Sequence, residues 1–203
     1  MPGTKATEAE RREQLLNAAY EVASRKGLDG LTVRAVAGKA GLSPGLVLYH
    51  FKRKDQLVRA LLDWLLRSTS LLQVPETISE IDDPVERLHT LLRQEMDRAS
   101  SDTGRSQLLF EYWALGTRHA AIRRRIEVEM NRYRLAFREV AEDVLRSEMG
   151  RFLGVTPDGL AAVAVSLVHG CAVQAMIDPK HFDIAEYLDA AEGLVGQIPL
   201  PTR

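Results

Sequence analysis

The sequence has little of what secreted, metal-binding or β-rich proteins need. Its 203 residues include one cysteine, Cys171, which excludes an internal disulfide framework and fits a reducing compartment. No segment alternates apolar and polar residues as a strand does, and no internal repeat occurs. Glycine-rich phosphate loops, Cys and His metal-ligand spacing and a Ser-His-Asp arrangement are also missing. The sequence therefore predicts neither an enzyme nor a metal or cofactor site.

Net charge is nearly absent as well, at −1, but its distribution is uneven. Residues 1–65 hold 11 Lys and Arg against 7 Asp and Glu, a net charge of +4. The remaining residues hold 16 against 21, a net charge of −5. A basic region on an acidic body favours contact with a polyanion, although a run of charge is more often only a solvated surface.

Long apolar runs are scarce. The opening residues, MPGTKATEAERREQ, lack the apolar core of a signal peptide, so we expect a cytoplasmic protein. Only Leu160–Ile177 suggests a membrane segment, and it contains Ser166, His169 and Gln174 without flanking basic anchors. A buried helix is the better interpretation of this segment.

Helix signals, by contrast, are dense, and they predict an all-α fold of about nine helices. Capping residues, prolines at first turns and apolar stripes at helical spacing mark the helix starts. Breaks are expected at Gln73–Asp83 and Ser100–Gly104. The predicted helices begin near Thr7, Thr32, Ser43, Asp55, Asp83, Gln107, His119, Thr156 and Asp183.

Two of these helices are short and adjacent, within LTVRAVAGKAGLSPGLVLYHFKRKDQL at 31–57. Gly41 ends the first, and Ser43 and Pro44 open the second. Short helices joined by a tight glycine turn cross steeply, as in a helix-turn-helix, whose second helix enters the major groove of DNA. An ordinary helical hairpin with a solvent-exposed basic edge fits the same spacing. Spacing alone therefore does not decide between a helix-turn-helix and such a hairpin.

A recognition helix must pack on its own domain with one face and reach DNA with the other. Val47 and Phe51, four residues apart, are expected to face inward. Gly45 has no side chain, which lets the backbone approach a phosphate or a base edge. Lys54 begins the next helix, where its ammonium and the helix amides would both face a phosphate.

The run Thr32–Leu57 resembles the DNA-binding domain of the tetracycline-repressor (TetR) family. The matching residues keep a fixed spacing without a gap: Gly27, Thr32, Val36, Ala37, Ala40, Gly41, Ser43, Gly45, Tyr49, His50, Phe51, Lys54 and Leu57. The later helices match the family in number and order, and the C-terminal half is similar to the choline-responsive BetI-type subgroup.

This resemblance implies a helix-turn-helix domain at 7–54, the start of a linking helix at 55–72, and a ligand-binding and dimerisation domain at 73–203. It implies a ligand-responsive homodimeric repressor that reads a palindromic operator of double-stranded DNA and is released by a small-molecule effector. The alternative is a helical protein-interaction module without sequence-specific DNA binding. The residues expected at the DNA are Thr32, Arg34, Ser43, Pro44, Gly45, Leu46, Leu48, Tyr49, His50 and Lys54.

Leu48 departs from the family pattern, which usually has Tyr at this position. Tyr49 could take over the missing contact, or Leu48 could touch a thymine methyl group. Operator affinity therefore does not carry over from the family to this chain.

The last two helices are expected to form the dimer interface, because one is apolar nearly all round and carries a stripe of small residues. The alternative is that both helices close a monomeric core. The expected interface residues are Val163, Ser166, Gly170, Val173, Ile184, Tyr187, Leu188, Ala191 and Leu194.

Seven large side chains are candidates for an effector pocket, although similar stripes at helical spacing also build ordinary cores. His169 lies mid-helix in an apolar segment, where an imidazole needs a hydrogen-bond partner or stays neutral. The helix from Asp55 starts beside Lys54 and carries Trp64, so we expect it to link effector binding to the DNA. The pocket candidates are Trp64, Met96, Phe110, Trp113, Tyr133, Phe137 and His169.

Overall fold

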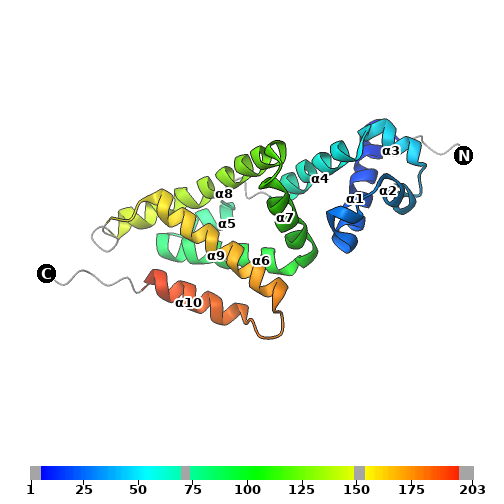
Figure 1. Cartoon of the computed structure of the whole chain (residues 1–203). Coiled ribbons are helices and arrows are strands. Elements are labelled where there is room, and N and C mark those ends of the chain that lie inside the picture. The colour runs from blue at the N-terminus through cyan, green and yellow to red at the C-terminus, as the bar shows by residue number, and fades with distance from the viewer. Residues whose placement is uncertain (1–5, 70–73, 149–153, 197–203) are drawn as a thin grey trace, which may run out of the picture. The chain divides into compact units, whose positions relative to one another are not determined.

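The computed structural model describes residues 6–69, 74–148 and 154–196, and every regular element in these ranges is an α-helix (Figure 1). The predicted all-α class is confirmed. The helices are α1 (Glu8–Gly30), α2 (Val33–Ala40), α3 (Pro44–Phe51), α4 (Lys54–Thr69), α5 (Glu76–Ser79), α6 (Pro84–Ser101), α7 (Thr103–Gly116), α8 (Ala120–Ser147), α9 (Pro157–Ile177) and α10 (Ile184–Gly196).

Most expected helix starts agree with the structure to within a few residues. The exception is α5, a single turn of four residues inside the segment expected to be a break. The predicted end of the linking helix, residues 70–72, lies outside the described residues.

Contacts divide the chain into two compact units. The first unit holds the described residues up to Thr69 together with Gln107–Ile126. The second unit holds the described residues from Val74 to Ser106 and from Glu127 onward. The second part of α7 and the first two turns of α8 therefore belong with α1–α4.

In the first unit, α1 begins with a capping box, at the start that the sequence predicts. The Thr7 hydroxyl accepts from the amide of Glu10 at 3.2 Å, and the Thr7 amide donates to the Glu10 carboxylate at 2.7 Å. The regular helix is interrupted at Gly27, and one further helical turn follows to Gly30. Gly27 has φ 68° and ψ 177°, and the following amide, of Leu28, donates to the Glu111 carboxylate at 2.7 Å. A side chain on α7 thus completes the interrupted turn.

The core of the first unit joins α1–α4, and polar contacts fasten α7 and α8 to α4. The Tyr112 hydroxyl donates to the carbonyl of Val58 at 2.7 Å, and Arg125 bonds Asp63 at 2.6 Å. Burial raises the pKa of Tyr112, so its hydroxyl keeps the proton that it donates. The buried apolar residues include Leu15, Leu16, Ala19, Val36, Val47, Phe51, Leu57, Leu61 and Leu65.

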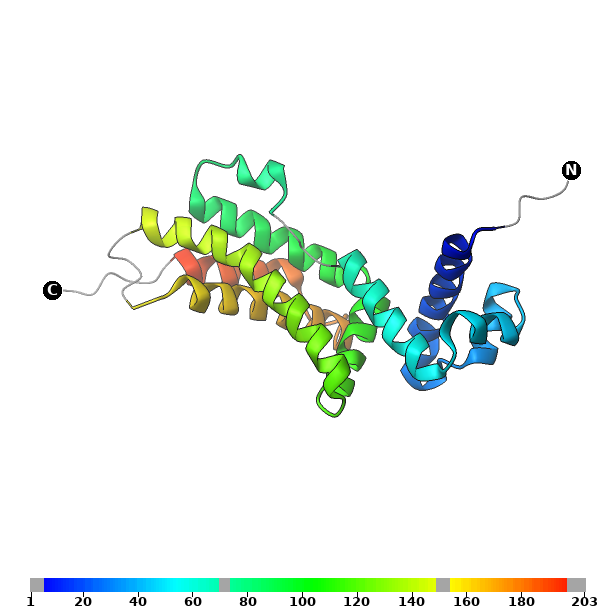
Figure 2. The same ribbon diagram turned by 90° about the horizontal axis from the view of Figure 1, so that it is seen from above.

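The second unit is built on α6 and α9, with α8 and α10 packed around them (Figure 2). Among the described residues, α9 alone is long and apolar enough to cross a membrane by length and composition. A single such helix is weak evidence, and eight of its residues are buried in the core, which fits the predicted core helix. The core of the unit includes Leu88, Leu91, Leu92, Met96, Phe137, Val140, Val144, Leu160, Ala164 and Val168.

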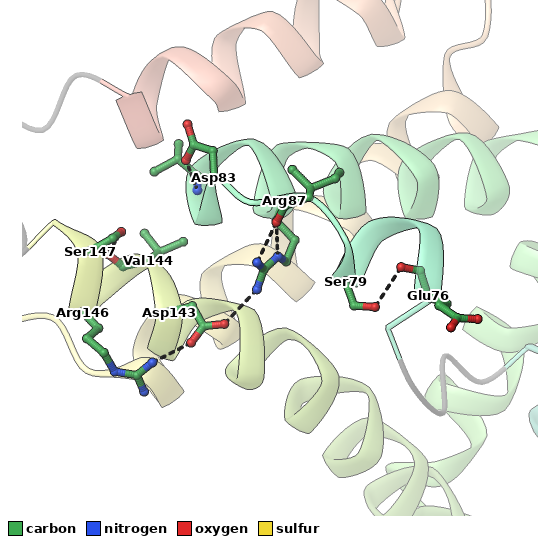
Figure 3. A network of polar contacts seen from close by, with 10 residues as sticks. Glu76, Ser79, Asp83, Arg87, Asp143, Val144, Arg146 and Ser147 are labelled. Carbon is green, nitrogen blue, oxygen red and sulfur yellow. Dashed lines mark hydrogen bonds and ion pairs between the residues drawn. The ribbon is translucent and has the colours of Figure 1, made fainter.

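A polar network ties the short α5 segment to the long helices of the second unit (Figure 3). Arg87 on α6 donates to the carbonyl of Ile81 at 2.6 Å and bonds Asp143 on α8 at 2.8 Å. Arg146 bonds the other oxygen of Asp143 at 2.7 Å. Because Arg87 is mostly buried, its guanidinium needs these partners, and they hold the chain around α5 against α6 and α8.

Candidate nucleic-acid interface

The turn between α2 and α3 has the local geometry that its sequence predicts. Gly41 has φ 67° and ψ 31°, a left-handed conformation that glycine adopts without steric cost, and it ends α2. The amide of Leu42 donates to the carbonyl of Ala37 at 2.9 Å, which closes the turn. The Ser43 hydroxyl then accepts from the amide of Leu46 at 3.2 Å, and Pro44 occupies the first turn of α3. Two short helices result, with a fixed turn between them.

Helix α3 has one buried face and one exposed face. Val47 is 0% exposed and Phe51 is 2% exposed, and the guanidinium of Arg12 lies 4.7 Å from the centre of the Phe51 ring. Tyr49 is 68% exposed and Leu48 is 44% exposed. Burial of large apolar side chains anchors the helix and leaves a second set of large side chains in solvent, as a groove-reading helix requires.

The remaining residues expected at the DNA also lie at or near the surface. Thr32 is exposed, but its hydroxyl accepts from the amide of Ala35 at 3.1 Å and so caps α2. Leu46 and His50 are half-buried, and the ring centres of His50 and Tyr49 lie 5.2 Å apart. The others are exposed: Arg34, Ser43, Pro44, Gly45 and Lys54.

A cationic turn follows α3 and begins α4. Lys52 has φ 52°, the only positive φ of a non-glycine residue in the described part of the chain. Such a conformation costs about 1–3 kcal/mol and persists where its surroundings hold it. Lys54 is the first residue of α4, and its ammonium donates to the carbonyl of Asp29 at 3.4 Å. Arg53 and Arg59 both bond the carboxylate of Asp55, so this acid is neutralised.

The sequence-based site omitted Lys52 and Arg53, although both stand in the run KRK. Both are exposed beside Lys54. The charge of the run is visible in the sequence, but the positive φ of Lys52, which fixes the turn, is not.

The first unit holds three of the pocket candidates. The indole of Trp64 donates to the Glu13 carboxylate at 2.6 Å, and its ring lies 5.5 Å from that of Tyr20. Trp64 is therefore bound to α1. Phe110 and Trp113 make an edge-to-face pair on α7, with ring centres 5.0 Å apart.

The other four candidates lie together in the second unit. Met96 and Phe137 are fully buried, and the Tyr133 ring lies edge-on to Phe137 at 5.4 Å. Tyr133 also stacks on His169, with ring centres 5.9 Å apart. Burial lowers the pKa of His169 to about 4, so its imidazole is neutral near pH 7.

A buried carboxylate accompanies these rings. Glu95 on α6 is 1% exposed, accepts from the Tyr133 hydroxyl at 2.8 Å, and is paired with Arg98 one turn later. Burial is the main cause that raises the pKa of Tyr133, and the nearby Glu95 carboxylate raises it further. The hydroxyl therefore stays protonated. Sequence reasoning missed Glu95. Its signal was an acid on the apolar stripe of α6, between Leu92 and Met96.

The expected dimer residues fall into two groups. Leu188 and Ala191 are buried in the core of the second unit, and the Tyr187 hydroxyl donates to the carbonyl of Leu167 at 3.1 Å. Gly170 and Ile184 are partly buried. Exposed residues form the second group: Val163, Ser166, Val173 and Leu194, together with Ile177, which the sequence-based set omitted.

Comparison with known proteins gives two family matches, one in each half of the chain. Residues 15–61 match the model of bacterial regulatory proteins of the tetR family, and residues 84–198 match that of the C-terminal region of BetI-type transcriptional repressors. An HTH-type transcriptional regulator BetI from Stenotrophomonas maltophilia is 30% identical over 110 residues. This alignment covers 54% of the chain and 56% of that relative, about half of each.

Solved structures share the fold. A regulator from Saccharomonospora viridis in complex with choline has a TM-score of 0.78 at 18% identity, covering 94% of this chain and 97% of that one. AibR, in complex with isovaleryl coenzyme A and operator DNA, has a TM-score of 0.68 at 17% identity, covering 91% and 97%. The BetI-type match alone spans more than half of the sequence, and the helix-turn-helix lies inside the other match. The chain therefore belongs to the tetR family of bacterial regulatory proteins, and its C-terminal region is of the BetI type.

Proposed function

We propose that this regulator is a homodimeric repressor that reads a palindromic operator with α3 and leaves it when a small-molecule effector binds. One observation carries the proposal: α3 is anchored by the buried Val47 and Phe51 while Tyr49, 68% exposed, stands in solvent. The protein works in the cytoplasm, where chromosomal DNA is accessible. Residues 7–54 form the DNA-binding domain, 55–72 begin the linking helix, and 73–203 bind the effector and the second subunit.

Some exposed residues of the interface contact the bases of DNA, and others contact its phosphate backbone. Tyr49 and Leu48 project from α3, so they meet base edges and thymine methyl groups in the major groove. Gly45 lets the first turn of α3 approach the duplex closely. Lys54 and the amides at the start of α4 hold a phosphate, which fixes the register of α3 in the groove.

A dimer is required because one helix-turn-helix covers only half of a two-fold operator. The apolar surface that would form it consists of exposed residues on α9 and α10: Val163 at 55%, Val173 at 38%, Ile177 at 73% and Leu194 at 70%. Exposed apolar side chains that gather on one face mark a contact surface, and the proposal requires these four to do so. A protein-interaction module would also use such a surface, but it would not need the capped α2–α3 pair and its exposed Tyr49.

The effector binds in the second unit, near the cluster of Glu95, Tyr133 and His169. Glu95 is paired with Arg98, so the cluster offers hydrogen bonds and ring surfaces with little net charge. A buried polar group is costly where apolar packing would suffice, which favours a role in recognition. The structural relative that holds choline supports a small polar effector.

Helix α4 connects the two functions. Its Trp64 donates to Glu13 on α1, so a shift of α4 is passed to the DNA-binding domain. A hundredfold change in DNA affinity needs about 2.7 kcal/mol of differential effector binding. If Trp64→Ala leaves effector-induced release of DNA unchanged, this role of α4 is wrong.

The central test is a binding titration on the DNA that flanks the protein's own gene. The wild-type protein should bind as a dimer, with sequence-selective and salt-sensitive affinity. The Tyr49→Ala/Lys54→Gln double variant should lose on the order of a hundredfold, because it removes one base contact and one phosphate contact. Lys180→Gln, an exposed cation of the second unit, is the control with the same charge change as Lys54→Gln. A monomeric protein whose double variant binds every duplex like the wild type would exclude the proposal.

A further inference from the structure

The first unit contains a cleft that the recognition helix does not use. It lies between the first turns of α4 and the corner where α7 ends and α8 begins, and it measures about 550 Å³. In both views α4 runs beside this corner (Figures 1 and 2). Its lining residues are Lys54, Asp55, Val58, Arg59, Leu115, His119, Ala120, Ala121 and Ile122.

The charged side chains around this cleft sum to a net positive charge, and Asp55 is the one acid that lines it. Lys54 and Arg59 line it from α4, and the carboxylate of Asp55 is neutralised by Arg53 and Arg59. The apolar lining residues, among them Val58 and Leu115, offer no counter-charge. Like charges placed together on a surface repel one another, so this arrangement favours an anionic partner.

The α7–α8 corner adds more positive charge. From Tyr112 to Ile126 the sequence has four arginines and one histidine and no acidic residue. Arg118 and Arg124 are exposed, and among the described residues neither has an acidic partner. Arg125, by contrast, is bound to Asp63. We define the basic corner as Arg118, His119 and Arg124.

We propose that the basic corner binds the phosphate backbone of DNA flanking the half-site read by α3. This inference rests on the proposed DNA binding. Lys54, which would hold a phosphate at the edge of the half-site, lines the same cleft as His119. Each DNA strand carries a phosphate about every 3.4 Å along the axis, so a strand that passes Lys54 presents further phosphates to cations on the other side of the cleft.

A polyanion fits this surface better than a small anion does. The cations are distributed along the cleft and over the corner rather than converging on one point, and the cleft itself is largely apolar. A chain of phosphates can contact separated cations one after another, and such contacts carry no sequence information. The basic corner therefore adds affinity to the DNA complex without changing which operator is chosen.

The test compares two duplexes that share one operator, one trimmed to its ends and one with about ten flanking base pairs on each side. The variant is Arg118→Gln/Arg124→Gln. The matched control is Arg134→Gln/Lys180→Gln, which removes two exposed cations from the second unit. On the long duplex, loss of two phosphate contacts per subunit should reduce the slope of log K against log salt by about 0.9 for each contact. At 0.1 M salt this corresponds to roughly 60-fold weaker binding for each subunit engaged.

The trimmed duplex should bind the variant, the control and the wild type equally. If the variant keeps the wild-type salt slope on the long duplex, or if trimming leaves wild-type affinity unchanged, the basic corner does not contact DNA. If inorganic phosphate at constant ionic strength raises the melting temperature of the wild type but not of the variant, while DNA affinity is equal, the corner binds a small anion and the inference is wrong. Failure of the wild-type protein to bind any operator would instead remove the proposed function itself.

Discussion

The exposed surface of α3, which we propose faces DNA, and the polar cluster of the second unit use similar side chains in opposite ways. On α3, Tyr49 and Leu48 are large and exposed, and the residues that pack are a separate set. In the second unit, Tyr133 and Phe137 pack in the core and also form the candidate effector site. A surface that binds a large, rigid partner keeps stability and recognition on different residues. A site enclosed in a core places both demands on the same residues.

The largest expected effect tests this separation at α3. Phe51→Ala removes a buried ring and should lower the free energy of unfolding by about 3–5 kcal/mol, with DNA binding lost as the first unit unfolds. Thermal and urea unfolding measure the change. Tyr49→Ala, on the exposed face, is the control that should leave stability unchanged. Equal loss of stability in both variants would contradict the division of α3 into two faces.

The second prediction concerns pH and the second unit. The pKa of His169 is about 4 in the folded protein against 6.5 when exposed, so the unfolded chain binds a proton that the folded one does not. The stabilisation that comes from a neutral His169 is complete above pH 6.5 and is lost as pH falls toward 4. The loss is about 3 kcal/mol. Urea unfolding at pH 7.0, 5.5 and 4.5 measures it, and His169→Gln should flatten the dependence, whereas His181→Gln, at an exposed position, should not.

Removal of the buried carboxylate should have a smaller effect. Glu95→Ala leaves the Tyr133 hydroxyl and the partly exposed Arg98 without their acceptor, at a cost of about 2 kcal/mol. If recognition and packing share this cluster, the same variant should also weaken effector-induced release of DNA. Calorimetry and DNA titration with effector give the two readouts. A stability loss without any change in the effector response would show that Glu95 is structural only.

Leu48 offers a milder test on the exposed surface. Leu48→Ala should weaken operator binding by about 1 kcal/mol through loss of apolar contact with a thymine methyl group, and stability should not change. Leu48→Tyr restores the residue usual in the family and should tighten binding. Fluorescence anisotropy with labelled operator measures both. Tighter binding by the alanine variant would place Leu48 away from the bases.

The smallest expected effect concerns Thr32, and it distinguishes a role in capping α2 from a role in contacting DNA. Its hydroxyl caps α2, so Thr32→Ala should cost about 1 kcal/mol of stability, and Thr32→Ser should restore it. Circular dichroism during thermal unfolding gives the comparison. If the serine variant recovers stability but not DNA affinity, the threonine methyl group also contacts the duplex.

Local signals allowed most of the first unit to be predicted. The caps at Thr7, Thr32 and Ser43 and the left-handed Gly41 each depend on residues within four positions, so the sequence contains all the partners. The extra turn of α1 could not be predicted in this way, because its amide is completed by Glu111, 83 residues later.

The second unit was harder to predict because its polar contacts also join residues that are far apart in the sequence. The position of Glu95 on the inner stripe of α6 was visible, but its partner Tyr133 is 38 residues away. Leu188 and Ala191 were assigned to the dimer surface and lie in the core, because periodicity gives an apolar face without the identity of what covers it. Contacts of long sequence separation decide such sites.

The contact between Leu28 and Glu111 has a consequence for the order of folding. The last turn of α1 leaves one amide to be satisfied by a carboxylate that is translated much later, and any side chain at Gly27 would meet the same carboxylate at about 3.2 Å. A fragment that stops at Thr69 would contain the whole α2–α3 pair and still lack this acceptor. The last turn of α1 therefore acquires its hydrogen-bond acceptor only when the later residue Glu111 has been added to the chain.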